Sequence, residues 1–128
     1  MPRGRPEQKL QTKIVTRLRR EFACLPVAVP NGGTRGKIEA IRLKEMGVTA
    51  GHPDLIVYGT ESRLVLLEVK VPGESLSYSQ KRVIPDLQGR GFPVFTVDSV
   101  EAAVDALHEC GFAPPTVAAF LSRETGGF

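Results

Sequence analysis

The sequence predicts a single α/β domain, and three observations support this prediction. Four segments have apolar spacing or composition typical of helices, and four shorter segments are rich in the branched apolar residues that strands favour. Glycines and prolines separate the two kinds of segment. The length of 128 residues and the hydrophobic content of 41% suit one core. The expected order is α-β-α-β-β-α-β-α, with helices at 6–22, 37–46, 77–90 and 99–109 and strands at 25–30, 54–58, 64–70 and 92–97.

Local signals mark several boundaries of these elements. Pro6 suits the first turn of the first helix, Gly47 suits the end of the second, and Ser99 is a good cap for the last. Pro85 lies inside the third helix and is expected to kink or divide it. A further short helix is expected at 117–121, in the tail that follows the last helix.

The first helix is amphipathic and carries an acidic residue on its apolar side. At about 100° per residue, Glu7 falls in line with Leu10 and Ile14. The simple explanation is that a carboxylate in the first turn complements the helix dipole. The alternative is that Glu7 is a functional acid, and the helix alone does not decide between the two.

Positive charge is concentrated near the N-terminus. Residues 1–20 hold seven basic residues and one acidic residue, a local balance of +6, whereas the other 108 residues hold ten basic and thirteen acidic residues, a balance of −3. A basic segment is typical of a surface that binds nucleic-acid phosphates, although a solvated helix face has a similar composition. The candidate DNA contacts in this segment are Arg3, Arg5, Lys9 and Lys13.

The cysteine content and the hydropathy pattern exclude several classes of protein. Cys24 and Cys110 have neither the spacing of a zinc site nor the number needed for a disulfide framework, so both are expected to be reduced thiols. No apolar run has the length of a membrane span, and the basic N-terminus lacks the apolar stretch of a signal peptide. These observations predict a cytoplasmic protein.

Two strand-like segments are expected to bring two acids and one amine together. Glu68 and Lys70 lie two residues apart in one strand, so their side chains project from the same face. If the two segments form a hairpin that turns over 60–62, Asp54 lies opposite Glu68. The spacing therefore predicts one patch that contains two carboxylates and one ammonium group.

This patch suits the hydrolysis of a phosphodiester. Neighbouring carboxylates repel each other, and a hard divalent cation such as Mg²⁺ or Mn²⁺ would relieve that repulsion. Asp54 and Glu68, with the Val69 carbonyl, are the expected ligands, and Lys70 would orient the attacking water or stabilise developing charge. The alternative is structural: Asp54 would cap a strand, and Glu68 with Lys70 would form a surface ion pair worth less than about 1 kcal/mol.

Five segments in order resemble a known nuclease family. Pro53-Asp54 with Glu68-Val69-Lys70 resembles the PD-(D/E)xK nuclease superfamily, and the fuller pattern resembles its VRR-NUC branch, the virus-type replication-repair nucleases. The matching segments are Pro6-Glu7, Asn31-Gly32-Gly33, 47–58 with Gly-His-Pro-Asp-Leu, Leu67-Glu68-Val69-Lys70 and 76–80. The resemblance covers about residues 6–98 and implies a mixed-sheet PD-(D/E)xK (restriction-endonuclease-like) core in a single domain 1–128, with a C-terminal helix and tail at 99–128.

The resemblance also implies roles for residues outside the acid pair. Glu7 matches the acid that reaches the metal site from the early helix, and Gln80 matches the glutamine that positions the water or a phosphate. Gln80 could instead only cap its helix. Asn31, Arg35 and His52 are expected to contact DNA, although His52 could instead only pack its turn.

Together these features predict a Mg²⁺- or Mn²⁺-dependent DNA endonuclease. The resemblance implies selectivity for DNA structure, including Holliday junctions, and a homodimer that presents two sites to a branched substrate. Two alternatives remain at this point. One is a DNA-binding module of the same fold without catalysis, and the other is a restriction-type endonuclease that recognises a sequence.

Overall fold

The computed structural model describes residues 5–30 and 36–116 and confirms the mixed α/β fold class. The helices are α1 (Arg5–Glu21), α2 (Lys37–Glu45), α3 (Tyr78–Gly89) and α4 (Val100–Glu109), and the strands are β1 (Leu25–Ala28), β2 (Leu55–Tyr58), β3 (Leu64–Val69) and β4 (Val94–Val97). The helix expected at 117–121 lies outside the described residues. Within the described ranges, no helix combines the length and the apolar composition that crossing a lipid bilayer requires.

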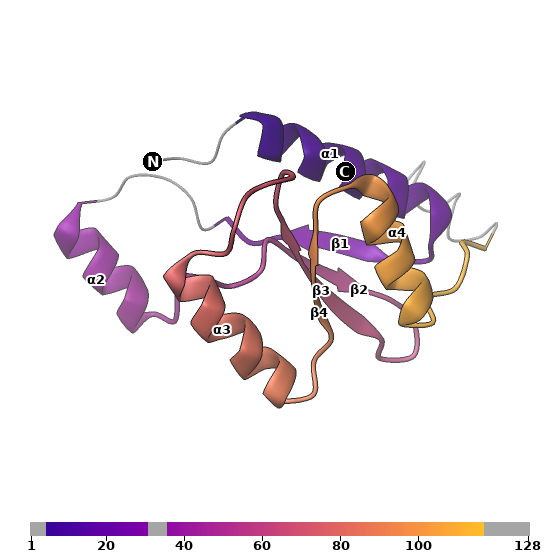
Figure 1. The fold of residues 1–128 in the computed structure, drawn as a ribbon. Helices are drawn as coiled ribbons and strands as arrows, with labels where there is room; N and C mark the ends of the chain where they lie inside the picture. The colour runs from indigo at the N-terminus through magenta and orange to yellow at the C-terminus, as the bar shows by residue number, and fades with distance from the viewer. Residues whose placement is uncertain (1–4, 31–35, 117–128) are drawn as a thin grey trace.

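The strands form one mixed sheet in the order β1-β2-β3-β4 (Figure 1). The pairs β1–β2 and β2–β3 are antiparallel, and β3 and β4 are parallel. In the β2–β3 hairpin Leu55 pairs with Leu67 and Tyr58 with Leu64, which confirms the predicted register. The helix α3 makes the crossover between the parallel strands, as a parallel pair requires.

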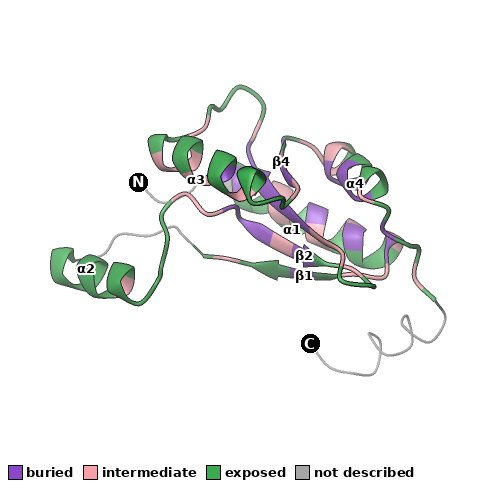
Figure 2. Cartoon of the chain, turned by 90° about the horizontal axis from the view of Figure 1, so that it is seen from below, coloured by how far each residue is buried: buried purple, intermediate pink, exposed green. Residues whose placement is uncertain are grey.

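Helices cover the two faces of the sheet unequally. The larger core lies between one face and the helices α1 and α4, with buried residues such as Val57, Val65 and Leu67 on the strands. Leu66 points to the opposite face, where it packs with Ile84 of α3 and with Val94. Figure 2 shows the buried residues along the sheet and on the inner sides of α1 and α4. The smaller cluster is the one that lies beside α3.

The buried side of α1 includes the acidic residue that the sequence placed there. Ile14 and Leu18 are fully buried in the larger core, and Glu7 is only 6% exposed. The helical periodicity of the sequence therefore identified the inner side of this helix correctly.

Pro85 does not divide α3, so the expectation of a divided helix was wrong. The helix runs continuously from Tyr78 to Gly89 with Pro85 inside it. Pro85 and Lys81 are both exposed, so water can hydrate the Lys81 carbonyl that loses its helical donor. Ile84 holds this part of the helix by packing against Leu66 and Val94.

The helix α2 contains no buried residue. Ile38 is 75% exposed and Ile41 is 52% exposed. The helix ends at Glu45 and is followed by Gly47 in the left-handed conformation, with φ +100°, as the sequence predicted for a glycine at this end. Figure 2 shows α2 standing away from the rest of the domain.

A close backbone contact joins the turn before β2 to the start of α3. Gly51 has φ +89°, and a Cβ at this position would overlap the backbone carbonyl of Ser79. Only glycine satisfies both conditions without strain. The contact fixes the turn that leads into Asp54 against the helix that carries Gln80.

Gly51→Ala is expected to lower the free energy of unfolding by more than about 2 kcal/mol, because the new Cβ adds an overlap to an unfavourable φ. Gly91→Ala is the matched control, since Gly91 has φ +95° and a Cβ there would meet no other atom within 4 Å. It should cost only about 1 kcal/mol. Urea denaturation measures both values, and equal losses would show that the contact with α3 contributes nothing.

Candidate active site

Charged side chains are rarely buried, and those that are buried in the described residues form a short set. Its members, with their exposed fractions, are Glu7 (6%), Asp54 (3%), Glu68 (0%) and Lys70 (9%). Burying charge costs free energy unless a partner or a bound ion compensates it. The sequence analysis singled out these same residues from their spacing, and they are the starting point for the candidate site.

Glu68 lies at the centre of this set, near the end of β3. Its Oε2 accepts a hydrogen bond from Gln80 Nε2 at 2.9 Å and lies 3.7 Å from Lys70 Nζ. Its Oε1 is shielded from solvent. Lys70 directly follows β3 and continues its pairing with β4, since Lys70 N donates to the Val97 carbonyl, so alternation along the extended chain accounts for the ion pair. The pair is buried, so the interpretation of Glu68 and Lys70 as a surface ion pair on an edge strand is wrong.

Gln80 serves two roles at once, both of which the sequence had left open. Its Oε1 accepts from Ser77 N at 2.8 Å, and its backbone N donates to Ser77 Oγ at 3.2 Å, so the two residues form a capping box. With the amide oxygen facing a backbone N–H, the amide nitrogen must face Glu68. The cap of α3 therefore orients the donor that holds Glu68.

Asp54 continues the sheet pairing one residue before β2. Val29 N donates to the Asp54 carbonyl at 2.8 Å, and extending the observed register by one residue places Asp54 opposite Glu68. The Asp54 side chain is fixed by a second contact, because its Oδ2 accepts from Val69 N at 2.7 Å. This donor was not predicted, since the sequence drew attention only to the Val69 carbonyl. The sequence offers one clue to this donor, because Val69 directly follows Glu68, the residue that lies opposite Asp54.

Glu7 comes from a different layer of the fold. It belongs to α1, which packs on the face of the sheet opposite to α3. In the parts of the chain that the structure describes, no three His, Cys, Asp or Glu side chains are grouped closely enough to hold a metal ion. Glu7, Asp54 and Glu68 therefore do not form a three-carboxylate cluster here.

The chemistry of the remaining donors suits a hard divalent cation. Mg²⁺ commonly takes one or two protein carboxylates and completes its octahedral coordination with water and substrate phosphate, so Asp54 and Glu68 suffice. In ionised form Asp54, Glu68 and Lys70 carry a formal charge of −1. That excess of negative charge is what a divalent cation would neutralise.

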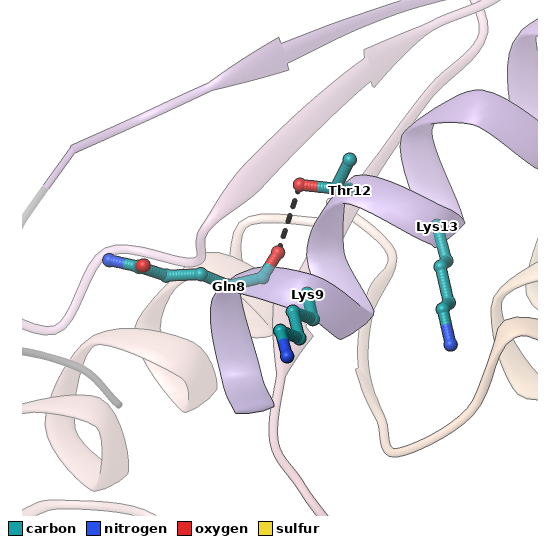
Figure 3. Close-up of a pocket in the computed structure, with 4 residues that line it drawn as sticks. All are labelled: Gln8, Lys9, Thr12 and Lys13. Carbon is teal, nitrogen blue, oxygen red and sulfur yellow. Dashed lines mark hydrogen bonds between the residues drawn. The ribbon is translucent and has the colours of Figure 1, made fainter. Parts of the chain in front are cut away.

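Of the predicted DNA contacts in the basic N-terminal segment, two lie on the described surface of α1. Lys9 and Lys13 are exposed on α1, where they line a groove of about 460 Å³ with Gln8 and Thr12. Figure 3 shows both lysine side chains extending outward from the helix. Thr12 Oγ1 donates to the Gln8 carbonyl at 3.0 Å beside them. These lysines present positive charge to solvent on the outer side of α1.

The other predicted contacts can be placed only in part. His52 is half-buried, and its Nδ1 lies 2.8 Å from the Pro53 carbonyl, so Nδ1 carries the proton and donates to that oxygen. This contact supports a role for His52 in packing the turn. Arg5 begins α1, while Arg3, Asn31 and Arg35 lie outside the described residues.

The cysteines do not offer a second reactive centre. Neither Cys24 nor Cys110 belongs to a disulfide in the described residues. Burial raises the pKa of the Cys110 thiol, and the neighbouring Glu109 charge raises it further. A raised pKa keeps this thiol protonated and therefore a poor nucleophile.

Comparison with known proteins agrees with the fold. The family model of the VRR-NUC domain matches residues 5–101. A solved structure of a VRR_NUC domain protein shares 21% identity and a TM-score of 0.65, covering 85% of this chain and 90% of its own. A second, described as a VRR_NUC domain, shares 22% identity and a TM-score of 0.59, covering 83% and 97% respectively. No curated protein matches the sequence.

The two structural likenesses establish the fold, whereas the family match spans most of the chain and includes the buried charged set and Gln80. The chain therefore belongs to the VRR-NUC family of nuclease domains.

Proposed function

We propose that the protein is a divalent-metal-dependent endonuclease that hydrolyses phosphodiester bonds in structured DNA, including Holliday junctions. The observation that carries this proposal is the buried arrangement of Asp54, Glu68 and Lys70 beside Gln80. A DNA-binding module without catalysis would have no need to bury these charges, because burial costs stability without adding affinity for DNA.

The residues of the site have distinct tasks in this proposal. Asp54 and Glu68 would hold Mg²⁺ or Mn²⁺, with the Val69 carbonyl as a further candidate. When bound, the cation would lower the pKa of a coordinated water and neutralise charge on the scissile phosphate. Val69 N–H and Gln80 keep the two carboxylates in fixed orientations. The Lys70 ammonium would orient the attacking water or stabilise charge that develops on the phosphate.

Selectivity for DNA structure rather than sequence is part of the same proposal. The exposed Lys9 and Lys13 would bind phosphates, which position DNA without specifying its sequence. A restriction-type enzyme would instead cut plasmid DNA at one fixed sequence.

Glu68→Gln is expected to lower the rate of DNA cleavage by at least about 10³-fold, because it removes a charged ligand and alters the contact with Lys70. The assay incubates labelled four-way junction, flap and linear duplex DNA with and without Mg²⁺ or Mn²⁺. The wild-type protein should cut the branched substrates faster than linear duplex, and only with the metal present.

Glu39→Gln is the matched control for this assay, since Glu39 is an exposed acid on α2, and its activity should equal that of the wild type. Cleavage that persists in Glu68→Gln would refute the site. Junction binding without cleavage by the wild type under all metal conditions would identify a non-catalytic module.

The double role of Gln80 can be separated by two substitutions. Ser77→Ala removes only the Oγ acceptor of the capping box and should cost about 1 kcal/mol of stability with little change in kcat. Gln80→Ala removes the other side-chain acceptor of the box and the donor to Glu68, so kcat should also fall by about 10-fold or more. Thermal unfolding and single-turnover cleavage measure the two effects. Equal kcat values for the two variants would show that the contact with Glu68 does not assist the reaction.

The proposed homodimer is supported by an apolar patch on the half of the sheet that α3 leaves open. Leu25 is 59% exposed and pairs in register with Tyr58, which is 42% exposed. Val27, two residues along β1 on the same face, is 37% exposed. An exposed patch of this kind suits a self-complementary contact about a two-fold axis.

Sedimentation velocity is expected to show a dimer, and Leu25→Lys should shift it toward the 13.9 kDa monomer because a charge would be buried at the contact. Ile38→Lys is the control, since it places the same charge on an exposed apolar position of α2, outside the proposed contact. A wild-type protein that sediments only as a monomer at high concentration would contradict the dimer.

A further inference from the structure

A groove of about 620 Å³ lies between α2 and α3. Figure 1 shows the two helices on the same side of the domain. The groove is lined by residues of both helices and of the segment between α2 and β2, namely Ala40, Leu43, Lys44, Val48, Thr49, Ala50, Ser79, Arg82 and Val83. It therefore has one wall that belongs to the body of the domain and one wall that belongs to α2.

The groove adjoins the candidate active site through two backbone connections. Ser79 lies in its lining and directly precedes Gln80, whose amide donates to Glu68. Ala50 also lies in the lining and directly precedes Gly51, which packs against the Ser79 carbonyl. A ligand in the groove would thus contact the residues next to those that position Glu68 and Asp54.

The groove is positively charged. Its charged lining residues are Lys44 and Arg82, and no acidic residue among those described lines it. Both cations are exposed, and neither forms an ion pair with any other residue in the described ranges. Leu43, Val48 and Val83 add apolar surface between these charges. This combination suits a polyanion that also exposes apolar groups.

The form of α2 is consistent with a ligand-binding wall. A helix of nine residues with no buried side chain has little intrinsic stability, since isolated helices shorter than about 12 residues are marginal in water. Leu43 is its one residue of intermediate exposure, and Leu43 lines the groove. The least exposed part of α2 is therefore the part that lines the groove.

We propose that the groove binds an unpaired segment of DNA next to the scissile phosphate. In this arrangement Lys44 and Arg82 bind backbone phosphates, and the apolar lining contacts sugars and bases. A duplex presents mainly phosphates to a flanking surface because its bases are stacked inside, whereas a single strand exposes both kinds of group. The proposal rests on the proposed function and specifies the substrate class as DNA with a single-stranded segment at the cutting site.

The test compares two double variants of the full-length chain that remove the same charge. Lys44→Ala with Arg82→Ala empties the groove of cations, and Arg42→Ala with Lys81→Ala removes two exposed cations from the same two helices outside the groove. Fluorescence anisotropy measures binding to a blunt duplex and to a fork with two unpaired arms. The buffer contains no divalent cation, so the DNA stays uncut.

The groove variant is expected to bind the fork about 10-fold more weakly and the duplex less than about 2-fold more weakly. For the fork, the slope of log affinity against log salt concentration should decrease by the amount expected for the loss of about two phosphate contacts. The control variant should lose the same small factor on both DNAs. Parallel losses on fork and duplex, or equal effects of the two variants, would overturn the proposal. Fork-selective loss of binding in a protein that cuts no DNA would support the groove and refute the nuclease.

Discussion

The antiparallel register between β2 and β3 is the constraint on which the candidate site depends. It places Asp54 opposite Glu68 and leaves Leu55 and Leu67 facing the larger core. Because side chains alternate along a strand, a slip of one residue would turn Glu68 into that core and expose Leu67. The hydrophobic effect that selects the core face therefore also brings the acids together. The register between β2 and β3 therefore determines both the packing of the core and the position of the two acids.

The burial of charge in this small domain is compensated by contacts that come from several elements. Val69 N–H holds Asp54, Lys70 lies beside Glu68, and Gln80 links Glu68 to the cap of α3. Each contact offsets part of the desolvation cost of a carboxylate and also fixes its direction. A divalent cation would complete this compensation. The helix cap and the site are thus coupled, since the side chain that stabilises α3 also orients an acid.

The body of the domain and α2 differ in how they are stabilised. The sheet, α1 and α4 share a continuous apolar core, whereas α2 adds no buried residue to it. An element that contributes so little to folding is expected to be retained for what it binds. Its position across a cationic groove from α3 fits that expectation. The close contact of Gly51 with Ser79 then places this groove and the acid pair on the same local framework.

The sequence by itself determined the features that depend on short-range periodicity and turn chemistry. These include the inner side of α1 with Glu7, the hairpin register, and the common face of Glu68 and Lys70. Only the tertiary structure decided which groups meet across distant segments. The Val69 donor to Asp54, the two roles of Gln80, the glycine required at residue 51, and the separation of Glu7 in another layer are of this kind. The physical reason is that a spacing in the chain specifies the direction of a side chain within its own element, whereas the packing of a helix against a turn depends on the whole core.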